Sequence, residues 1–248
     1  MIKSKKLSNF KNIEHGFFNR LGGKSTGIFK SLNCGSGSFD NKKNIIKNLE
    51  IISNKINAKS KKIVLLNQTH SSKFYYIGKG SKLNNTKFNG DALITNKKNL
   101  PIAILTADCA PILIHDDDKQ MIAAIHAGWK GAYKDIVEKV VKFMVKKGCS
   151  PKNITAAIGP CISSDNYEVK EDLKKKFINK NKKNIIFFKT TKDKNYFNLN
   201  KYIHFQLESL NIKKIDIINK DTFNAKNNFF SARRSISRNE SDYGRNIS

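Results

Sequence analysis

Residues 101–131, PIAILTADCAPILIHDDDKQMIAAIHAGWKG, contain three short apolar runs in close succession. Runs 101–106 and 121–125 lack the alternation of apolar and polar residues that a half-exposed strand shows. They are therefore predicted to be strands buried on both faces, with a third strand, 111–115, between them. Buried strands need helices packed against the sheet, so this stretch favours an α/β protein.

The rest of the chain alternates between strand and helix patterns. Further strands are expected at 63–66, 73–77, 92–95, 154–158, 185–188 and 215–218. Helices are expected at 40–56, 131–147, 170–179 and 199–210. Asp40 is the expected N-cap of the first helix, and Gly148 is the expected stop of the second. No internal repeat is visible, and we expect one mixed α/β domain over residues 1–248.

The charge of the chain suggests a nucleic-acid-binding protein at first sight. The formal net charge is +27 over 248 residues. Only five of the 47 basic residues are Arg, however, and the lysines are spread along the whole chain. Dispersed charge gives only weak nonspecific attraction, so we favour a solvated lysine surface and expect no specific nucleic-acid partner.

Cysteine use and hydropathy predict a cytoplasmic protein. The four cysteines are far apart and form no CxxC pair, and the first residues contain no secretory apolar region. No apolar run approaches the roughly 20 residues that a membrane span needs. We therefore expect reduced thiols, a cytoplasmic location and no membrane partner.

Three residues of metal-binding type, His70, Cys109 and His126, follow or end expected strands. Ligands of open α/β sheets bind at the carboxyl ends of strands, so these side chains are expected to meet at one edge. Imidazole and thiolate suit zinc or copper, and three protein ligands leave one position of a tetrahedral metal free for catalysis. The alternative is structural, because a lone Cys after a strand is commonly a core residue and a lone His is commonly a surface residue.

The neighbours of these three residues have more than one interpretation. Asp108 points away from Cys109 in an extended chain, so it can orient a ligand, act as a general base or cap a turn. Trp129 can stack on a planar ring or pack in the core. Gly128 and Gly131 can leave backbone N–H groups free for an anion at a helix N-terminus.

Arginine is concentrated near the C-terminus, at Arg233, Arg234, Arg238 and Arg245. A guanidinium group binds phosphate through two parallel hydrogen bonds, so this group of residues is a candidate anion site. The other interpretation is an exposed, flexible C-terminal segment.

Five motifs occur in a fixed order: NQTHS (67–71), ADCAPI (107–112), IHAGWKG (125–131), IGPCI (158–162) and FFSARR…YGR (229–245). Together they resemble the YfiH-like family, often labelled polyphenol oxidoreductase laccases and associated with purine nucleoside phosphorylase and adenosine deaminase activity. The resemblance implies a single-domain, mixed-sheet α/β sandwich. It also implies one zinc or copper ion bound by His70, Cys109 and His126 at a nucleoside pocket.

The same resemblance implies a reaction of adenosine, inosine or methylthioadenosine with phosphate that yields the free base and the sugar 1-phosphate. Asp108 and Cys109 would be catalytic, with Asp108 as proton carrier in adenosine deamination. The candidate contacts for nucleoside or phosphate are Arg20, Trp129, Lys130, Arg233, Arg234 and Arg245. The protein would act as a monomer or small homo-oligomer.

The same sequence allows other functions. A multicopper oxidase needs several coppers and many histidine ligands, and the chain has only five His, so oxidase activity would be a side reaction of bound copper. An editing hydrolase of peptidoglycan precursors could use the same metal site. A basic nucleic-acid-binding protein is the remaining alternative.

Overall fold

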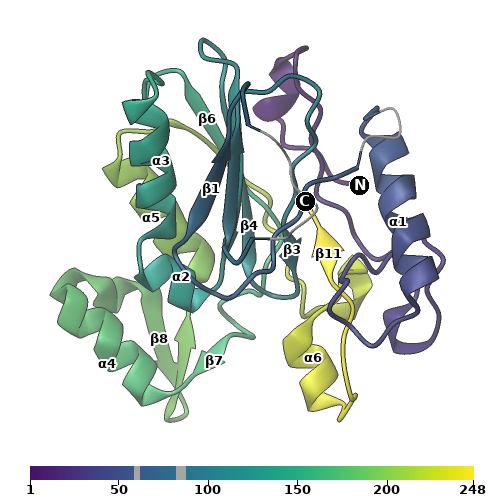
Figure 1. The fold of residues 1–248 in the computed structure, drawn as a ribbon. Coiled ribbons are helices and arrows are strands. Elements are labelled where there is room, and N and C mark those ends of the chain that lie inside the picture. The colour runs from purple at the N-terminus through teal and green to yellow at the C-terminus, as the bar shows by residue number, and fades with distance from the viewer. Residues whose placement is uncertain (59–61, 82–87) are drawn as a thin grey trace.

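The computed structural model describes residues 1–58, 62–81 and 88–248, and its centre is a six-stranded sheet (Figure 1). The strands lie in the order β1-β2-β5-β4-β6-β10. They are β1 (Phe74–Ile77), β2 (Ala92–Thr95), β4 (Ala110–Asp116), β5 (Met121–Ala127), β6 (Ile154–Ile158) and β10 (Lys214–Ile217). The two outer pairs are parallel and the three inner pairs are antiparallel. The predicted mixed-sheet α/β class is confirmed.

The antiparallel hairpin of β4 and β5 forms the middle of the sheet. Asp116 lies opposite Met121 beside the turn, and Ala110 lies opposite Ala127 at the far end. All seven residues of β4 are buried, and so are six of the seven in β5. The lack of alternation in 121–125 therefore predicted burial on both faces correctly.

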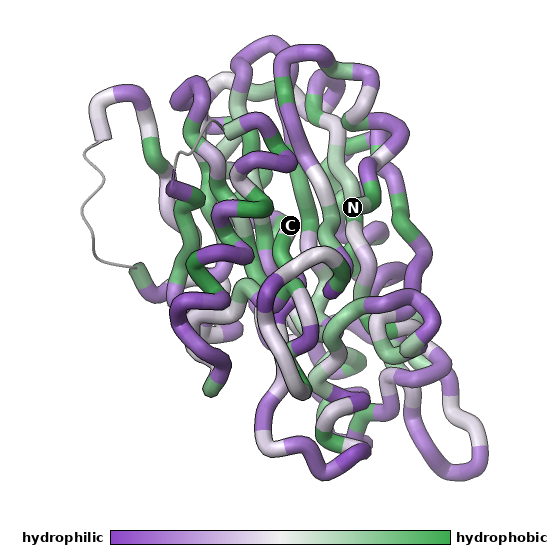
Figure 2. Tube along the Cα trace, turned by 90° about the vertical axis from the view of Figure 1, so that its right-hand side faces the viewer, coloured by the Kyte–Doolittle hydropathy of each residue, from purple (hydrophilic) through white to green (hydrophobic). Residues whose placement is uncertain are grey.

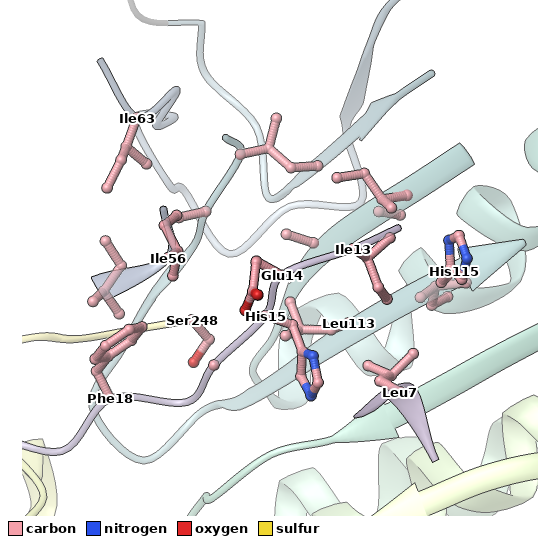
Figure 3. A pocket seen from close by; sticks show the side chains of 18 of the residues that line it. Leu7, Ile13, Glu14, His15, Phe18, Ile56, Ile63, Leu113, His115 and Ser248 are labelled. Atoms are coloured by element: carbon pink, nitrogen blue, oxygen red, sulfur yellow. The ribbon is translucent and has the colours of Figure 1, made fainter. Parts of the chain in front are cut away.

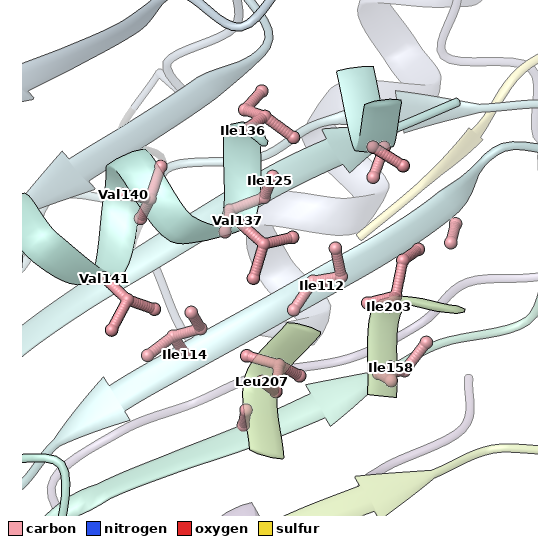
Figure 4. Packing of buried hydrophobic residues seen from close by; sticks show 14 of the residues in the cluster. Ile112, Ile114, Ile125, Ile136, Val137, Val140, Val141, Ile158, Ile203 and Leu207 are labelled. Atoms are coloured by element: carbon pink, nitrogen blue, oxygen red, sulfur yellow. The ribbon is translucent and has the colours of Figure 1, made fainter. Parts of the chain in front are cut away.

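Three helices cover one face of the sheet: α2 (Trp129–Tyr133), α3 (Ile136–Lys146) and α5 (Leu199–Ser209). Figure 4 shows Val137 and Val140 of α3 beside strand residues such as Ile112 and Ile125. These side chains have no exposed surface, and shortening one buried aliphatic side chain to Ala costs about 2–5 kcal/mol. Hydrophobic segments lie mainly in the interior of the trace, and hydrophilic segments lie mainly around it (Figure 2).

The helix predicted over 131–147 is two helices, because the chain turns sharply between α2 and α3. Asp135 has a left-handed φ of 59°, which ends α2. Lys180 Nζ binds the Asp135 carboxylate at 2.6 Å, and Gln206 Nε2 donates to the Ala132 carbonyl at 3.0 Å. These contacts stabilise the break, and Gly148, with φ of 95°, ends α3 as predicted.

The other face of the sheet is covered by a layer that includes α1 (Lys42–Lys55), the 3-10 helix η1 (Leu7–Asn9) and the strand pair β3 (Leu105–Thr106) and β11 (Asn246–Ile247). The N-cap of α1 is Asn41, whose side chain accepts a hydrogen bond from the Lys43 N–H. The prediction of Asp40 was wrong by one residue. Asp40 is buried and accepts hydrogen bonds from Ser25 and Asn33.

A small lobe lies at one end of the sheet (Figure 1). It consists of β7 (Glu168–Val169), α4 (Glu171–Lys180), the 3-10 helix η3 (Lys182–Phe187), β8 (Phe188–Thr191) and β9 (Lys194–Phe197). Phe177 of α4 is fully buried, and the centroid of its ring lies 4.8 Å from that of Phe197. The strand predicted at 185–188 was wrong, because most of that run belongs to η3. The remaining helices are η2 (Gly27–Phe29), η4 (Ala225–Asn227) and α6 (Ala232–Ser237).

Two other predicted strands are largely absent from the described chain. Residues 63–66 form only an isolated bridge from Val64 to Ile102, and of 101–106 only the last two residues form a strand. Both runs are apolar because they pack between the sheet and α1. Their apolar pattern therefore indicates burial, but not hydrogen-bonded pairing with a neighbouring strand. Among the described residues, none of the helices has the length and apolar character needed to cross a membrane.

Candidate metal centre

His70, Cys109 and His126 meet at one place, with their ligand atoms all within 4.8 Å of one another. Cys109 Sγ lies 3.8 Å from His70 Nε2. The two imidazole rings are nearly perpendicular, with centroids 4.8 Å apart. His126 is buried and His70 is exposed, so the cluster is held by the protein on one side and open to solvent on the other.

Strand register explains why residues so far apart in sequence meet. Cys109 immediately precedes β4, and His126 is the last residue but one of β5. Pro111 pairs with His126 in antiparallel register, which brings the start of β4 to the end of β5. The expected convergence is observed, but Cys109 reaches the shared edge at the beginning of an antiparallel strand rather than at a carboxyl end.

Gly128 makes room for this cluster. A Cβ atom at this position would lie 2.7 Å from Cys109 Sγ and 3.1 Å from His70 Cδ2. Both distances are too short for ordinary contact, so the close approach of thiol and imidazole requires glycine here. The need for close packing against the cluster therefore explains the glycine at position 128, and no anion site is needed to explain it.

Asp91 holds two of the three residues in place. Its Oδ1 lies 2.8 Å from His126 Nδ1 and accepts the His70 backbone N–H at 3.0 Å. Its Oδ2 accepts the Ser71 backbone N–H and hydroxyl at 2.6 and 2.7 Å. A carboxylate acceptor assigns the proton of His126 to Nδ1 and leaves Nε2 to face Cys109.

Electrostatics favour the ligand form of the thiol. Burial would raise the pKa of Cys109, but the charge of His126 and hydrogen bonds from both imidazoles outweigh burial and lower it to about 7. Burial opposes the charge of His126 as well, yet Cys109 and Asp91 raise the pKa of that imidazole. A thiolate that forms near neutral pH is ready to bind a metal, since metal binding needs the deprotonated thiol.

The donor set fits a metal ion. Two imidazole nitrogens and one thiolate are ligands that zinc and copper accept, and the exposed side leaves a position for a substrate or water. Among the described residues this is the one group of three or more His, Cys, Asp or Glu side chains found close enough to hold an ion.

The Asp108 carboxylate does not belong to this group of close ligand atoms. It has a left-handed φ of 83°, and its carboxylate accepts hydrogen bonds from Thr222 Oγ1 and from the Arg233 N–H, both at 2.7 Å. Burial raises its pKa, although these two hydrogen bonds act in the opposite direction. The contacts are those of a residue that fixes a turn and the start of α6, which was one of the alternatives.

The arginines of the C-terminal segment differ in what they contact. Arg234 is buried and donates to the carbonyl oxygens of Thr222, Phe223 and Phe229. Arg245 pairs with Asp242 at 3.0 Å and donates to the Tyr243 carbonyl. Both guanidinium groups are engaged with the protein itself. Much of this segment is therefore packed against the protein rather than exposed.

Arg233 and Arg20 have fewer internal partners. Arg233 Nη2 donates to the Glu168 carbonyl at 2.9 Å, and the guanidinium lies 5.7 Å from the centroid of the Tyr167 ring. Arg20 donates from Nε to the Lys30 carbonyl, and its Cζ atom lies over the Phe230 ring, 4.8 Å from the centroid. Their remaining N–H groups make these two the better candidates for an anion.

Trp129 and Lys130 lie at the start of α2, directly after Gly128. Trp129 is half-buried and packs against the main hydrophobic core. The Nζ atom of Lys130 lies 5.6 Å from the centroid of the Trp129 ring, and Lys130 is exposed. The observed contacts of Trp129 are those of the packing interpretation.

Sequence reasoning missed Asp91 and Tyr167. Burial raises the pKa of Tyr167, and so does the nearby Cys109, whereas Arg233 lowers it. Tyr167 therefore lies close enough to both Cys109 and Arg233 for their charges to act on its hydroxyl group. The one signal for Asp91 was a carboxylate directly before a fully buried strand, and no pattern singled out Tyr167.

Comparison with known proteins places the chain in a family. Residues 14–248 match the family described as multi-copper polyphenol oxidoreductase laccase. The chain belongs to this family. It is similar to purine nucleoside phosphorylase RC0672 of Rickettsia conorii, at 34% identity over 88% of this chain and 91% of the relative. It is also similar to purine nucleoside phosphorylase RP494 of Rickettsia prowazekii, at 36% identity over 79% of each chain.

Solved structures of this YfiH-like family share the fold. The crystal structure of the Bacillus licheniformis hypothetical protein YfiH matches with a TM-score of 0.85 and 27% identity, over 94% of this chain and 90% of that one. Neisseria meningitidis protein NMB0706 matches with a TM-score of 0.84 and 26% identity, over 96% and 93%. The predicted family and its mixed-sheet α/β fold are therefore confirmed.

Proposed function

We propose that this chain is a metal-dependent purine nucleoside phosphorylase. In this reaction phosphate attacks C1′ of the nucleoside and the purine leaves. The observation that carries the proposal is the His–Cys–His cluster, with three ligand atoms within 4.8 Å and one open side. Curated relatives at 34–36% identity are named purine nucleoside phosphorylase, which supports the same reaction here.

We propose zinc as the ion, with copper as the alternative, held by His70 Nε2, Cys109 Sγ and His126 Nε2. A bound zinc supplies a Lewis acid that polarises the purine or lowers the pKa of a water. The protein contributes the fixed geometry. Asp91 orients His126 and the loop of His70, and Gly128 lets the thiolate approach the imidazole.

The proposed phosphate contacts are Arg20 and Arg233. The guanidinium group of each donates one hydrogen bond to a backbone carbonyl, which leaves further N–H donors for an anion. Burial lowers the pKa of Arg20, and so do the neighbouring charges of Arg234 and Arg238, whereas Glu240 raises it. Positive charge gathered in this way favours a bound anion. Arg234 and Arg245 would support the site by fixing the backbone, while Trp129 and Lys130 stay candidates for contact with the base.

Adenosine deamination is proposed as a second activity of the same centre. Asp108 remains the candidate proton carrier, because burial raises its pKa and it lies next to Cys109 in the chain. Its two hydrogen bonds hold it on the α6 side of the site, so it would have to act through a water or the substrate. Deamination therefore has weaker geometric support than phosphorolysis.

The location and assembly state are also proposals. All four cysteines are free thiols, which is usual in the reducing cytoplasm. We propose a cytoplasmic protein with one catalytic domain over residues 1–248 that acts as a monomer or small homo-oligomer. Its partners would be a purine nucleoside and phosphate.

The test is incubation of the purified protein with adenosine, with and without phosphate, followed by identification of the products. Phosphorolysis yields adenine only when phosphate is present. Deamination yields inosine without phosphate, and with phosphate it yields inosine together with the hypoxanthine that phosphorolysis of inosine releases. Cys109→Ala should abolish both along with the metal, whereas Cys149→Ala, which removes a buried thiol elsewhere, should keep them. Full turnover by metal-free Cys109→Ala protein would refute the proposal.

A further inference from the structure

Tyr167 is a half-buried residue whose hydroxyl group has no partner in the described part of the chain. The hydroxyl forms no hydrogen bond with any described residue, and its oxygen is not among the fully buried atoms that lack a partner. It therefore keeps some contact with solvent. Polar groups in partly closed sites are usually paired, so this hydroxyl is available to a bound molecule.

Backbone contacts fix Tyr167 near Cys109. The Ile162 N–H donates to the Asp108 carbonyl at 3.0 Å, which ties the segment before Tyr167 to the residue before Cys109. The Tyr167 carbonyl accepts the N–H of Phe197, a fully buried residue, at 3.1 Å. These contacts hold the Tyr167 backbone between the metal centre and the small lobe.

Two neighbours hold the Tyr167 ring. The Cζ atom of Arg233 lies over the ring, 5.7 Å from its centroid, and the centroid of the Phe197 ring lies 6.0 Å away. The Arg233 backbone N–H donates to the Asp108 carboxylate, and Arg233 Nη2 donates to the Glu168 carbonyl. The ring is thus positioned by packing, and the hydroxyl is not needed to keep it there.

The hydroxyl group of Tyr167 keeps its proton at neutral pH. Burial raises the pKa of Tyr167, and so does the nearby Cys109, although Arg233 acts in the opposite direction. A neutral phenol donates one hydrogen bond and accepts others, which matches the hydroxyl groups of a sugar.

The order of the reacting groups in phosphorolysis indicates which part of the substrate lies here. Phosphate attacks C1′ from the side opposite the departing purine, so the ribose lies between phosphate and purine. With the purine at the metal and phosphate at Arg233, the ribose lies between Cys109 and Arg233. Tyr167 is close to both of these residues.

We propose that the Tyr167 hydroxyl forms a hydrogen bond with a ribose hydroxyl group at C2′ or C3′ and so selects ribonucleosides. The inference rests on the proposed function, because that reaction supplies the order of phosphate, ribose and purine. A site that hydrogen-bonds a substrate hydroxyl discriminates against the analogue without it, since the protein group then loses its partner.

Two cavities on the α1 side of the sheet are a different location for a nucleoside. The inner one, of about 70 Å³, is shown in Figure 3, and the outer one has a volume of about 490 Å³. The outer volume is in the range of small-molecule sites. Among the described residues that line them, none is Tyr167, Arg233 or a proposed metal ligand. A nucleoside bound there would not respond to a change at Tyr167.

Calorimetry of inosine and of 2′,3′-dideoxyinosine, without phosphate, tests the proposal. Inosine is not converted under these conditions, because phosphorolysis needs phosphate and the base has no amino group to lose. Wild-type protein should bind inosine at one site per chain, and more tightly than the dideoxy analogue. Tyr167→Phe keeps the ring and removes only the hydroxyl. It should weaken inosine binding by about 3–10-fold and leave binding of the analogue unchanged.

Tyr133→Phe is the matched control. Tyr133 is also half-buried, with Lys180 Nζ 5.1 Å from the centroid of its ring and the Phe177 centroid 5.2 Å away. No described contact joins it to Arg233 or to the proposed metal ligands. It should leave both affinities unchanged, and both variants should keep the metal content and the unfolding temperature of the wild type.

The outcomes separate this inference from the proposed function. Equal weakening of inosine and the analogue by Tyr167→Phe, a loss of affinity that only follows a loss of metal, or no weakening at all would overturn the inference. In these cases wild-type turnover of inosine with phosphate would leave the proposed function standing. Wild-type protein that neither binds inosine nor converts it with phosphate would overturn both.

Discussion

The Nδ1 atom of His126 lies 2.8 Å from Oδ1 of Asp91, and the two side chains are 4% and 0% exposed. The same carboxylate accepts the backbone N–H groups of His70 and Ser71. One buried side chain thus orients one proposed ligand directly and positions the loop of another. Burial opposes its ionisation, but these hydrogen bonds and His126 lower the pKa of Asp91 to about 2, so it is ionised at neutral pH.

Asp91→Asn should weaken zinc binding by about 10–100-fold, which is typical for the loss of a carboxylate that orients a metal ligand. The amide keeps the shape of the side chain but loses the charge that holds Nδ1–H of His126. Competition with a chromophoric zinc chelator measures the affinity. Asp193→Asn, an exposed residue in the turn between β8 and β9, is the control. Wild-type affinity in Asp91→Asn would show that the carboxylate does not position the centre.

Cys109 in the metal-free protein should react with iodoacetamide with a midpoint near pH 7 rather than near its ordinary value of 9.0. The pKa is lowered in the folded protein, so the reactive thiolate is present above pH 7 and is lost as the pH falls below it. Cys149, whose pKa burial raises to about 12, should not compete at neutral pH. Mass spectrometry of labelled peptides follows each thiol, and zinc should protect Cys109. A midpoint near 9 would contradict the proposed thiolate.

Gly128→Ala should reduce both metal affinity and nucleoside turnover. The added methyl group would lie 2.7 Å from Cys109 Sγ, so the thiol or the backbone must move away from the imidazoles. Gly37→Ala is the control, because a Cβ atom there meets nothing within 4 Å. Metal content and turnover are measured on both variants, and we expect a loss in Gly128→Ala alone.

Arg234→Ala should lower the free energy of unfolding by roughly 2–4 kcal/mol, because it leaves three backbone carbonyl groups without their buried donor. Arg238→Ala, at an exposed site, should change it by no more than about 0.5 kcal/mol. Urea unfolding measures both. Wild-type stability combined with lost phosphorolysis would instead assign Arg234 to phosphate.

The central hairpin and its flanking helices were predictable because their apolar patterns are long and continuous. The run 121–125 became β5, and the helical spacing of Val137, Val140 and Val141 became the buried face of α3. Short apolar runs were less informative. Residues 63–66 and 185–188 are equally apolar, but tertiary packing placed the first in irregular chain and most of the second in a 3-10 helix.

The candidate metal ligands were found because His, Cys and Gly in polar loops stand out against apolar strands. The residues that support them were not, because their roles depend on contacts between distant segments. Asp91 acts across 35 residues on His126, and Asp108 acts across 125 residues on Arg233. The sequence suggested that Arg234 binds phosphate. The fold shows that its guanidinium group instead donates hydrogen bonds to backbone carbonyl groups.

X-ray absorption at the zinc edge, on protein with a measured metal content, identifies the atoms that bind the proposed ion. We expect one zinc per chain, bound by one sulfur and two imidazole nitrogens, with an exchangeable light atom in the remaining position. Cys109→Ala should lose the sulfur signal and the metal, and Cys149→Ala should keep both. A metal bound without sulfur, or turnover of nucleoside by protein that holds no metal, would contradict it.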